Sequence, residues 1–335
     1  MYNQNMKTIN EKLDISFERT NALDMYLPSA GFAVLDLETM GISPAYNPVI
    51  LSGMITVDED GINLKQFFAT SPEDEEELLR YTLKELSALS YVITYNGKTF
   101  DMPFLDRRMK KYGLEMPDLF NLDLYHLFRH YSDLPKLIPK LNQKTLEEYA
   151  GIATLREDRI SGGESVDLYN QYVETGSMDF ERRILLHNSD DVKQLSRLMA
   201  LLRNCNIHRA FHKNGFPISR GRITSVNISK GDMNIEGKVD APIDYISFPS
   251  IERPYHLQIT KSNGQFTINL PCEIKEKNVF IDLGFLDSEN KSLLEGLPAY
   301  VNGFLILVES GNTNYIASNL LAREIADFAL SEALE

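Results

Sequence analysis

Residues 31–38, GFAVLDLE, form an apolar run that ends abruptly in two carboxylates. A preceding glycine and the bulky apolar residues predict a β-strand here. Asp36 and Glu38 are separated by one residue, so the two-residue repeat of a strand points both carboxylates to the same face. Two like charges beside a core repel each other unless a cation lies between them. For this pair alone, a strand that runs out into an acidic turn is the alternative interpretation.

The flanking sequence predicts an α/β domain around this strand. VILSGMITV (49–57) and INLKQFFAT (62–70) are further strands, and an amphipathic helix follows Ser71 and continues to about Leu89. A strand at 91–95, a helix from about 103 to 112 and a short strand near 119–124 come next. Strands in a meander, followed by strands that alternate with helices, are typical of a mixed sheet flanked by helices.

A second acidic signal follows the strand at 91–95. In YNGKTFDMPFL (95–105), Asp101 precedes a helix that carries Phe104 and Leu105. Asp101 as a helix N-cap is the structural alternative. The two interpretations are compatible, since a capping aspartate is held rigidly and has a second oxygen available.

The third signal is in the last long helix of this half, ERRILLHNSDDVKQLSRLMALLR (181–203). Asp191 lies on the inward stripe, where a purely structural helix would carry leucine. Asp190 is rotated by about 100° from that stripe, so we expect Asp191 to face the site. His187 precedes Asp191 by one turn, so imidazole and carboxylate can point into one cleft. A buried histidine with a structural role is the alternative. The stripe consists of Ile184, Asn188, Asp191, Leu195, Leu198 and Leu202.

Together these side chains predict a metal-dependent site. Asp36, Glu38, Asp101 and Asp191 offer oxygen ligands, which suit Mg²⁺ or Mn²⁺. Two such ions about 3.5–4 Å apart can bind a phosphodiester between them. His187 would take the proton from the attacking water, because its unperturbed pKa lies near the operating pH. We expect no lysine ammonium among these acids.

At these residues the sequence resembles the DEDD exonucleases, which have the ribonuclease H-like fold. The motifs are DLET in the first strand, NGKTFD after a later strand and HNSDD in a late helix. The loop REDRISGGES (156–165), followed by Tyr169, resembles the bacterial YprB-type ribonuclease H-like branch. The resemblance covers about residues 28–203 and implies metal-dependent 3′-to-5′ hydrolysis of phosphodiesters.

The resemblance also implies roles for individual residues. Asp36, Glu38, Asp101 and Asp191 match the metal ligands of the family, and His187 matches its general base. Three residues separate His187 from Asp191, as in the tyrosine members, whereas well-studied histidine members have four. Contacts with the terminal nucleotide are implied for Thr39, Gly41, Asn96 and Phe100.

The second half of the chain has a different texture. Short alternating segments separated by Gly, Pro, Asn and Asp follow Gly215, and a helix begins near Ser318. The Asn263-Gly264 pair between two such segments predicts a hairpin. We predict a smaller β-rich domain with a C-terminal helix, which either binds nucleic acid or binds other proteins. The predicted division is 1–27 (N-terminal extension), 28–205 (exonuclease domain), 206–221 (basic linker) and 222–335 (β-rich domain).

Charge is unevenly distributed along the chain. The formal net charge is -14, which repels polyanions unless cations gather locally. Between Val192 and Gly231 no acidic residue occurs, and this segment contains Arg220 and Arg222. We expect these arginines either to bind substrate phosphates or to belong to an ordinary solvated helix end and linker.

The cysteines and the chain start indicate a cytoplasmic setting. Cys205 and Cys272 lie far apart, and the start of the chain lacks the apolar stretch of a secretory signal. We therefore predict a cytoplasmic 3′-to-5′ exonuclease that acts on single-stranded DNA or RNA with two Mg²⁺ or Mn²⁺ ions. The alternatives are a catalytically silent nucleic-acid-binding or scaffold protein with the same fold, and a phosphoesterase for small nucleotides.

Overall fold

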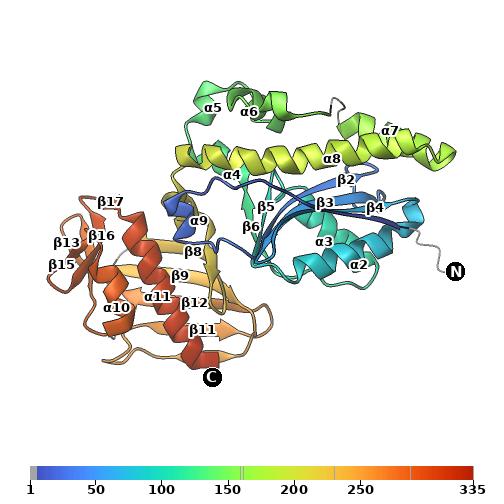
Figure 1. The fold of residues 1–335 in the computed structure, drawn as a ribbon. Coiled ribbons are helices and arrows are strands. Elements are labelled where there is room, and N and C mark those ends of the chain that lie inside the picture. The colour runs from blue at the N-terminus through green and yellow to red at the C-terminus, as the bar shows by residue number, and fades with distance from the viewer. Residues whose placement is uncertain (1–5, 159, 161, 230, 287, 335) are drawn as a thin grey trace. The chain divides into compact units, whose positions relative to one another are not determined.

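The computed structural model describes residues 6–158, 160, 162–229, 231–286 and 288–334 (Figure 1). The chain divides into two compact units, Met1–Cys205 and Asn206–Glu335. Among the described residues, no helix has the length and apolar character needed to cross a membrane.

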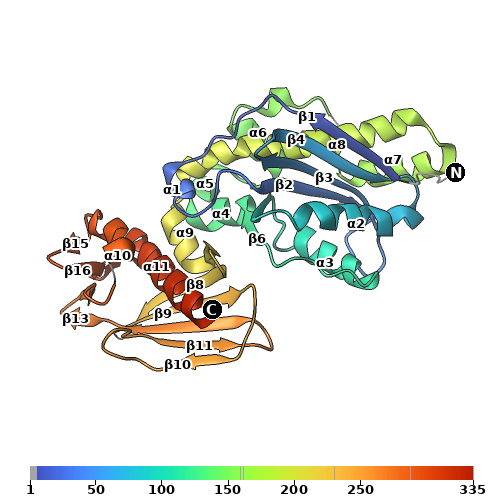
Figure 2. The ribbon, with the colours of Figure 1, turned by 60° about the horizontal axis from the view of Figure 1, so that its bottom comes forward.

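The first unit is built on one six-stranded mixed sheet. Its strand order is β1-β4-β3-β2-β5-β6, and Figure 2 shows the first four of these strands side by side. The β2–β5 and β5–β6 pairs are parallel and the others are antiparallel. The strands are β1 (Met6–Lys12), β2 (Phe32–Thr39), β3 (Val49–Asp58), β4 (Gly61–Ala69), β5 (Tyr91–Thr94) and β6 (Phe120–Asp123).

Helices cover both faces of this sheet. Helix α8 packs against β2, β3 and β4, and α2 packs against β3 and β4 from the opposite face (Figure 1). The helices are α1 (Asn21–Asp24), α2 (Glu75–Leu86), α3 (Asp101–Lys111), α4 (Leu124–Tyr131), α5 (Leu134–Leu137), α6 (Gln143–Tyr149), α7 (Gly162–Thr175) and α8 (Met178–Leu198). The predicted mixed sheet flanked by helices is therefore confirmed.

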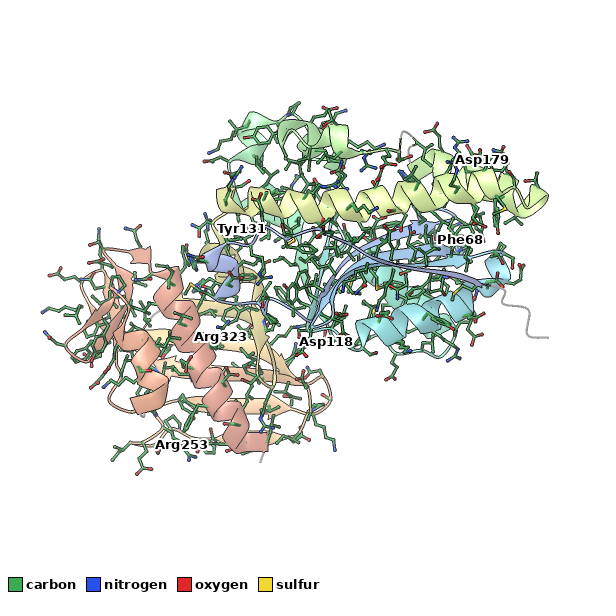
Figure 3. The ribbon with its side chains drawn as sticks, in the orientation of Figure 1. Phe68, Asp118, Tyr131, Asp179, Arg253 and Arg323 are labelled. Carbon is green, nitrogen blue, oxygen red and sulfur yellow. The ribbon has the colours of Figure 1, made fainter. Side chains whose placement is uncertain are left out.

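Each face of the sheet has its own apolar cluster. Leu35 and Leu37 of β2 pack with α2 and α3. On the other face, Phe68 of β4, labelled in Figure 3, packs with Tyr169 of α7 and with Ile184 of α8. Because alternate strand residues face opposite sides, the side chains of Asp36 and Glu38 project toward α8.

Residues 6–12, which were predicted to lie in an extension, instead form strand β1. It pairs antiparallel with β4, with Met6 opposite Ala69 and Lys12 opposite Asn63. Farther along the same predicted extension, Leu23 of α1 is fully buried, so this short helix is also part of the fold. The strand is mostly polar because it lies at the edge of the sheet and exposes much of its length, so its sequence carries little apolar signal.

In its described residues the second unit has two antiparallel sheets and a long C-terminal helix, which confirms the predicted β-rich domain with a C-terminal helix. The sheet orders are β10-β11-β12-β9-β8-β7 and β13-β14-β16-β15, with β17 paired to β16. The predicted hairpin at Asn263-Gly264 joins β11 to β12. The elements are α9 (Ile207–Asn214), β7 (Phe216–Ile218), β8 (Gly221–Ser229), β9 (Asp232–Val239), β10 (Tyr245–Ser247), β11 (His256–Thr260), β12 (Gln265–Pro271), β13 (Glu273–Lys275), β14 (Asn278–Asp282), α10 (Ser288–Glu295), β15 (Tyr300–Val301), β16 (Phe304–Glu309), β17 (Asn312–Thr313) and α11 (Tyr315–Leu334).

Most of the predicted basic linker, 206–221, is part of the core of this unit. Phe211 of α9 and Phe216 of β7 are buried, with ring centroids 6.3 Å apart. The guanidinium of Arg323 of α11 lies 5.2 Å from the centroid of the Phe216 ring. The apolar residues of α9 recur at helical spacing and bury one face of the helix, whereas its charged residues are exposed or half-buried. This basic segment is therefore largely made of a helix and a strand of the second unit.

Candidate active site

Asp36 and Glu38 of β2 share one region with Asp101 and Asp191. Burial raises the pKa of Asp36 well above its usual value, and the charges of Asp191, Asp101 and Glu38 raise it further, in that order. Glu38 and Asp101 are buried, whereas Asp36 is partly exposed. The structure therefore brings together the four carboxylates predicted from three separate motifs.

Helix α8 contributes both of its predicted groups to this region. His187 Nε2 lies 3.7 Å from Glu38 Oε1 and 3.5 Å from Asp191 Oδ2. One ligand atom from each of these three residues lies within 4.8 Å of the others, close enough to hold one metal ion. Burial raises the pKa of Glu38 to about 7, and the nearby His187 opposes that shift.

Asp36 is held by an amide from the same helix. Asn188 Nδ2 donates to Asp36 Oδ2 over 3.0 Å, and Gln66 Nε2 donates to Asn188 Oδ1 over 3.0 Å. Asp36, Gly53 and Gln66 are register partners across β2, β3 and β4. A Cβ atom on Gly53 would come within 1.7 Å of Asn188 Oδ1. The glycine thus provides the space that lets Asn188 reach the sheet.

His187 is oriented by Asp158, a residue of the loop before α7 that the sequence analysis did not identify. His187 Nδ1 and Asp158 Oδ2 are 2.5 Å apart, and both residues are buried. The carboxylate accepts, so Nδ1 carries the proton and Nε2 faces the acids. Burial lowers the pKa of His187, but Asp191, Glu38 and Asp158 outweigh it and raise the pKa above its usual value.

The cluster also contains a cation that the sequence analysis missed. Arg156 Nη2 donates to Asp191 Oδ1 over 2.6 Å and to Glu147 Oε1 over 2.7 Å. The side chain of Arg156 is 7% exposed and that of Glu147 is 1% exposed. The ion pair neutralises part of the negative charge around Asp191. The sequence analysis expected no lysine among these acids. The cluster nevertheless contains a basic side chain, that of Arg156.

Asp190 has a different role from its neighbour. Its Oδ2 accepts hydrogen bonds from the backbone amides of Glu157 and Asp158, each over 2.7 Å. Asp190 thereby holds the loop that carries Arg156 and Asp158, whereas Asp191 faces the cluster. Arg159 and Ser161 of the same loop lie outside the described residues.

Asp101 is the first residue of α3, and Phe100 occupies the N-cap position. The N-cap alternative for Asp101 is therefore wrong. Burial raises the pKa of Asp101 to about 7, Asp123 adds to the shift, and the backbone amides of Asp101 and Leu37 oppose it.

Asp123, at the end of β6, organises the loop that precedes Asp101. It accepts from the amide of Asn96 over 2.9 Å and from that of Lys98 over 3.0 Å. Asn96 has a φ of 63°, in the left-handed region that asparagine tolerates better than most residues. The missed residue Asp123 thus fixes the position of the second motif.

The residues that the resemblance linked to substrate lie in different surroundings. Thr39 is buried, and its hydroxyl donates to the carbonyl oxygen of Gly41 over 2.8 Å. Asn96 lines a hollow that Asp36 also lines. Phe100 packs on Phe104, with ring centroids 5.3 Å apart, as part of the apolar cluster between the sheet and α2 and α3.

Arg220 and Arg222 belong to the second unit. Arg222 is in β8 and Arg220 precedes that strand. The acidic cluster is built from residues of the first unit, so it does not include them.

The residues of the cluster fit a divalent cation. Carboxyl groups whose pKa values are raised by burial and by one another destabilise the fold when they ionise. A divalent cation among them would offset that repulsion, and donors that are mostly oxygen favour a hard cation.

The comparisons with known proteins agree with this geometry. A sequence profile of the RNase H superfamily matches residues 33–203. The chain is 30% identical over 172 residues to the uncharacterized protein YprB of Bacillus subtilis, over 49% of this chain and 40% of YprB. It is 27% identical over 110 residues to a DNA polymerase of Methanocaldococcus jannaschii, over 30% of this chain and 7% of the polymerase.

Among solved structures, the family B DNA polymerase of the archaeon Pyrobaculum calidifontis is similar, with a TM-score of 0.41 and 20% sequence identity. That match covers 52% of this chain and 25% of the polymerase. The chain spans less than half the length of each of these relatives. The profile match covers half of the chain and includes the strand and helix that carry Asp36, Glu38, His187 and Asp191, so the chain belongs to the RNase H superfamily.

Proposed function

We propose that the protein is a metal-dependent 3′-to-5′ exonuclease that hydrolyses phosphodiester bonds of single-stranded DNA or RNA. The observation that carries this proposal is the gathering of Asp36, Glu38, Asp101 and Asp191 in one region, with Glu38 and Asp191 beside the imidazole of His187. Acidic residues from three separate segments of the chain meet inside a packed domain at a cost in stability, which cation binding would offset. The similarity to a part of a DNA polymerase supports nucleic acid as the substrate class.

In this proposal, Asp36, Glu38, Asp101 and Asp191 hold two Mg²⁺ or Mn²⁺ ions. Bound divalent cations would polarise the scissile phosphodiester and stabilise the charge on the leaving oxygen. His187 accepts the proton of the attacking water at Nε2, which faces Glu38 and Asp191. Asp158 holds the proton on Nδ1 and keeps the ring in this orientation.

Besides the proposed metal ions, Arg156 places a positive charge beside Asp191. Its guanidinium is fixed by Glu147 as well as by Asp191, so it is preorganised. We place the reaction in the cytoplasm, in agreement with the two free cysteines, Cys205 and Cys272, among the described residues.

The test is hydrolysis of single-stranded DNA and RNA labelled at the 5′ end. With Mg²⁺ or Mn²⁺, the labelled strand should shorten stepwise from its 3′ end, and EDTA should stop the reaction. A strand labelled at the 3′ end should lose its label in the first step. Failure to degrade any DNA or RNA, structured or unstructured, with either metal would contradict the proposal.

A second candidate is a catalytically silent nucleic-acid-binding protein. The ion pair between Arg156 and Asp191 favours it, because a guanidinium already neutralises one of the four proposed metal ligands. This candidate predicts binding of nucleic acid without turnover, and no stabilisation of the protein by Mg²⁺ or Mn²⁺. The same hydrolysis assay, together with a thermal melt at increasing metal concentration, separates the two candidates.

A further inference from the structure

An open hollow of about 1060 Å³ lies beside the acidic cluster in the first unit, and Asp36 forms part of its wall. The remaining wall comes from the loop after β5, from helix α4 and from residues 135–143. Small-molecule sites have volumes of about 300–1,000 Å³. The hollow is therefore large enough for more than one nucleotide, which favours a polymer over a mononucleotide as its occupant.

The charge of the hollow is opposite to that of the whole chain. Arg129 and Lys140 line it and are exposed, whereas Asp36 is the acidic member of its described lining. The chain as a whole has a formal net charge of -14, so a polyanion needs a local group of cations. Arg129 and Lys140 provide such a group next to one of the proposed metal ligands.

An aromatic side chain, that of Tyr125, lies next to Arg129, whose guanidinium is 5.8 Å from the centroid of its ring. Tyr125 lines the hollow and is half-buried, and Arg129 Nη1 donates to its hydroxyl over 2.8 Å. The ring of Tyr95 contacts that of Tyr125 edge-on, with centroids 5.8 Å apart. A tyrosine held in this way offers a rigid face on which a base can stack.

Residues 141–143, another part of the wall, are tied to the site. Tyr95 donates its hydroxyl hydrogen to the carbonyl oxygen of Leu141. Gln143 Nε2 donates to the backbone carbonyl oxygen of Asp191 over 3.0 Å. These bonds connect residues 141–143 to the loop after β5 and to α8, so the fold itself holds this part of the wall in place.

We propose that this hollow binds the single strand upstream of the scissile bond, with phosphates on Arg129 and Lys140 and a base on Tyr125. The inference rests on the proposed function, because Asp36 orients the strand only if that residue acts at the scissile bond. The strand runs from Asp36 along α4 toward residues 135–143.

The test measures binding without turnover. Fluorescence anisotropy with 5′-labelled oligo(dT) of increasing length gives the affinity in EDTA and, separately, with Ca²⁺. Affinity should increase with length from two to six nucleotides, as added phosphates reach the cations. For Arg129→Gln with Lys140→Gln, this increase should disappear, and the slope of log affinity against log salt should fall in magnitude by about 1.4 for two phosphate contacts.

A matched control removes two charges from the other face of the sheet. Arg80→Gln with Lys110→Gln changes exposed residues of α2 and α3 that pair within their own helices, and it should leave affinity and salt slope unchanged. Tyr125→Leu should weaken binding about tenfold, whereas Tyr125→Phe, which keeps the ring, should retain most of the affinity.

The outcomes separate this inference from the proposed function. Wild-type affinity and slope in the Arg129 and Lys140 double variant would overturn the inference, even if the wild type degrades nucleic acid. Failure of the wild type to bind any oligonucleotide in both EDTA and Ca²⁺ would also overturn it. Length-dependent binding that needs these residues, without hydrolysis in Mg²⁺ or Mn²⁺, would support the inference and contradict the proposed function.

Discussion

The two units of the protein bury ionisable groups in different surroundings, with opposite consequences for how stability depends on pH. The first unit gathers Asp36, Glu38 and Asp101, whose pKa values are raised because burial and neighbouring charges disfavour ionisation. The second unit buries His212, whose pKa burial lowers to about 4, so that it is neutral at pH 7. Its Nδ1 donates over 3.1 Å to Oδ1 of Asn319, an amide whose Nδ2 donates to the carbonyl of His208.

This difference indicates which unit contains side chains that lower the stability of the fold. In the second unit, a neutral imidazole with a hydrogen-bond partner is an ordinary part of a core. In the first unit, ionised carboxylates crowd together and oppose folding near neutral pH unless a cation binds. Crowding of this kind is typical of functional sites. The contrast locates the proposed chemistry in the first unit on physical grounds.

The largest effect is expected when the acidic cluster loses a ligand. Asp36→Asn keeps the shape of the side chain but removes its charge, so hydrolysis should fall by about 10³-fold or more, as several kcal/mol of charge stabilisation are lost. Stability in EDTA should stay the same or rise, because like-charge repulsion decreases. The measurements are the rate of degradation of a labelled strand and the thermal midpoint.

Asp106→Asn, which changes a half-exposed aspartate of α3 paired with Lys110, serves as the matched control and should have no effect. Asp36→Asn with full activity would show that this carboxylate is not a metal ligand. Asp191→Ala is a less direct test, because it also removes a partner of the buried guanidinium of Arg156.

The second prediction concerns the stability of the first unit without divalent cations. Glu38 and Asp101 have folded pKa values of about 7, above their unfolded values, so the folded state binds more protons between about pH 4 and 7. The first unit should therefore gain stability as the pH falls from 8 to 5 in EDTA. A pKa shift of this size in one group corresponds to about 3 kcal/mol of unfolding free energy. We expect the coupled cluster as a whole to contribute a gain of this size to the first unit.

Hydrogen exchange followed by mass spectrometry measures the stability of each unit separately. Adding Mg²⁺ or Mn²⁺ should stabilise the first unit at pH 8 and reduce its dependence on pH. A first unit that is equally stable at pH 8 and pH 5 in EDTA would show that its carboxylates are not crowded as the structure indicates.

The third prediction tests the orientation of His187. Asp158→Asn weakens the hydrogen bond that holds Nδ1, so kcat should fall about 10²-fold, within the range of general base catalysis, while KM stays nearly constant. Steady-state kinetics on a short single strand measures both values. Asp167→Asn, at an exposed position of α7, is the control. A rise in KM with unchanged kcat would assign Asp158 to substrate binding instead.

The smallest effect is expected from His212 in the second unit. Its folded pKa of about 4 lies below the unfolded value, so the unfolded state binds more protons between about pH 6.5 and 4. The second unit should lose on the order of 2 kcal/mol as the pH falls through this range, opposite in sign to the first unit. In His212→Gln, which does not titrate, hydrogen exchange of the second unit should lack this loss. An identical loss in the variant would assign the pH dependence to other groups.

Local sequence patterns were sufficient for most of the fold. Alternation in residues 32–39 placed Asp36 and Glu38 on one face, and the register of β2 bears this out. The helical period separated Asp191 from Asp190, but both lie at least partly inside. Asp191 Oδ2 lies 3.5 Å from His187 Nε2, whereas Asp190, the more buried of the two, binds backbone amides of the loop before α7. Local patterns can indicate side-chain direction in this way because the periods of a strand and a helix fix it within a few residues.

The weaker predictions concerned polar segments. Residues 6–12 form an edge strand without an apolar run, and 207–214 form a buried helix whose charged residues suggested a linker. In each case the deciding partner, β4 or α11, is far away in the sequence. Burial of one face against such a partner overrides the local composition.

The sequence by itself determined the order of the elements and the side chains that carry the proposed chemistry, because periodicity is a local property. Only the tertiary structure decided that Asp158 orients His187, that Arg156 neutralises Asp191, and that Gly53 makes room for Asn188. The sequence feature that can indicate a close approach of this kind is a glycine inside a buried strand, here Gly53 of β3. These contacts join residues more than 25 positions apart through irregular loops, and no repeat in the sequence encodes the distance between such residues.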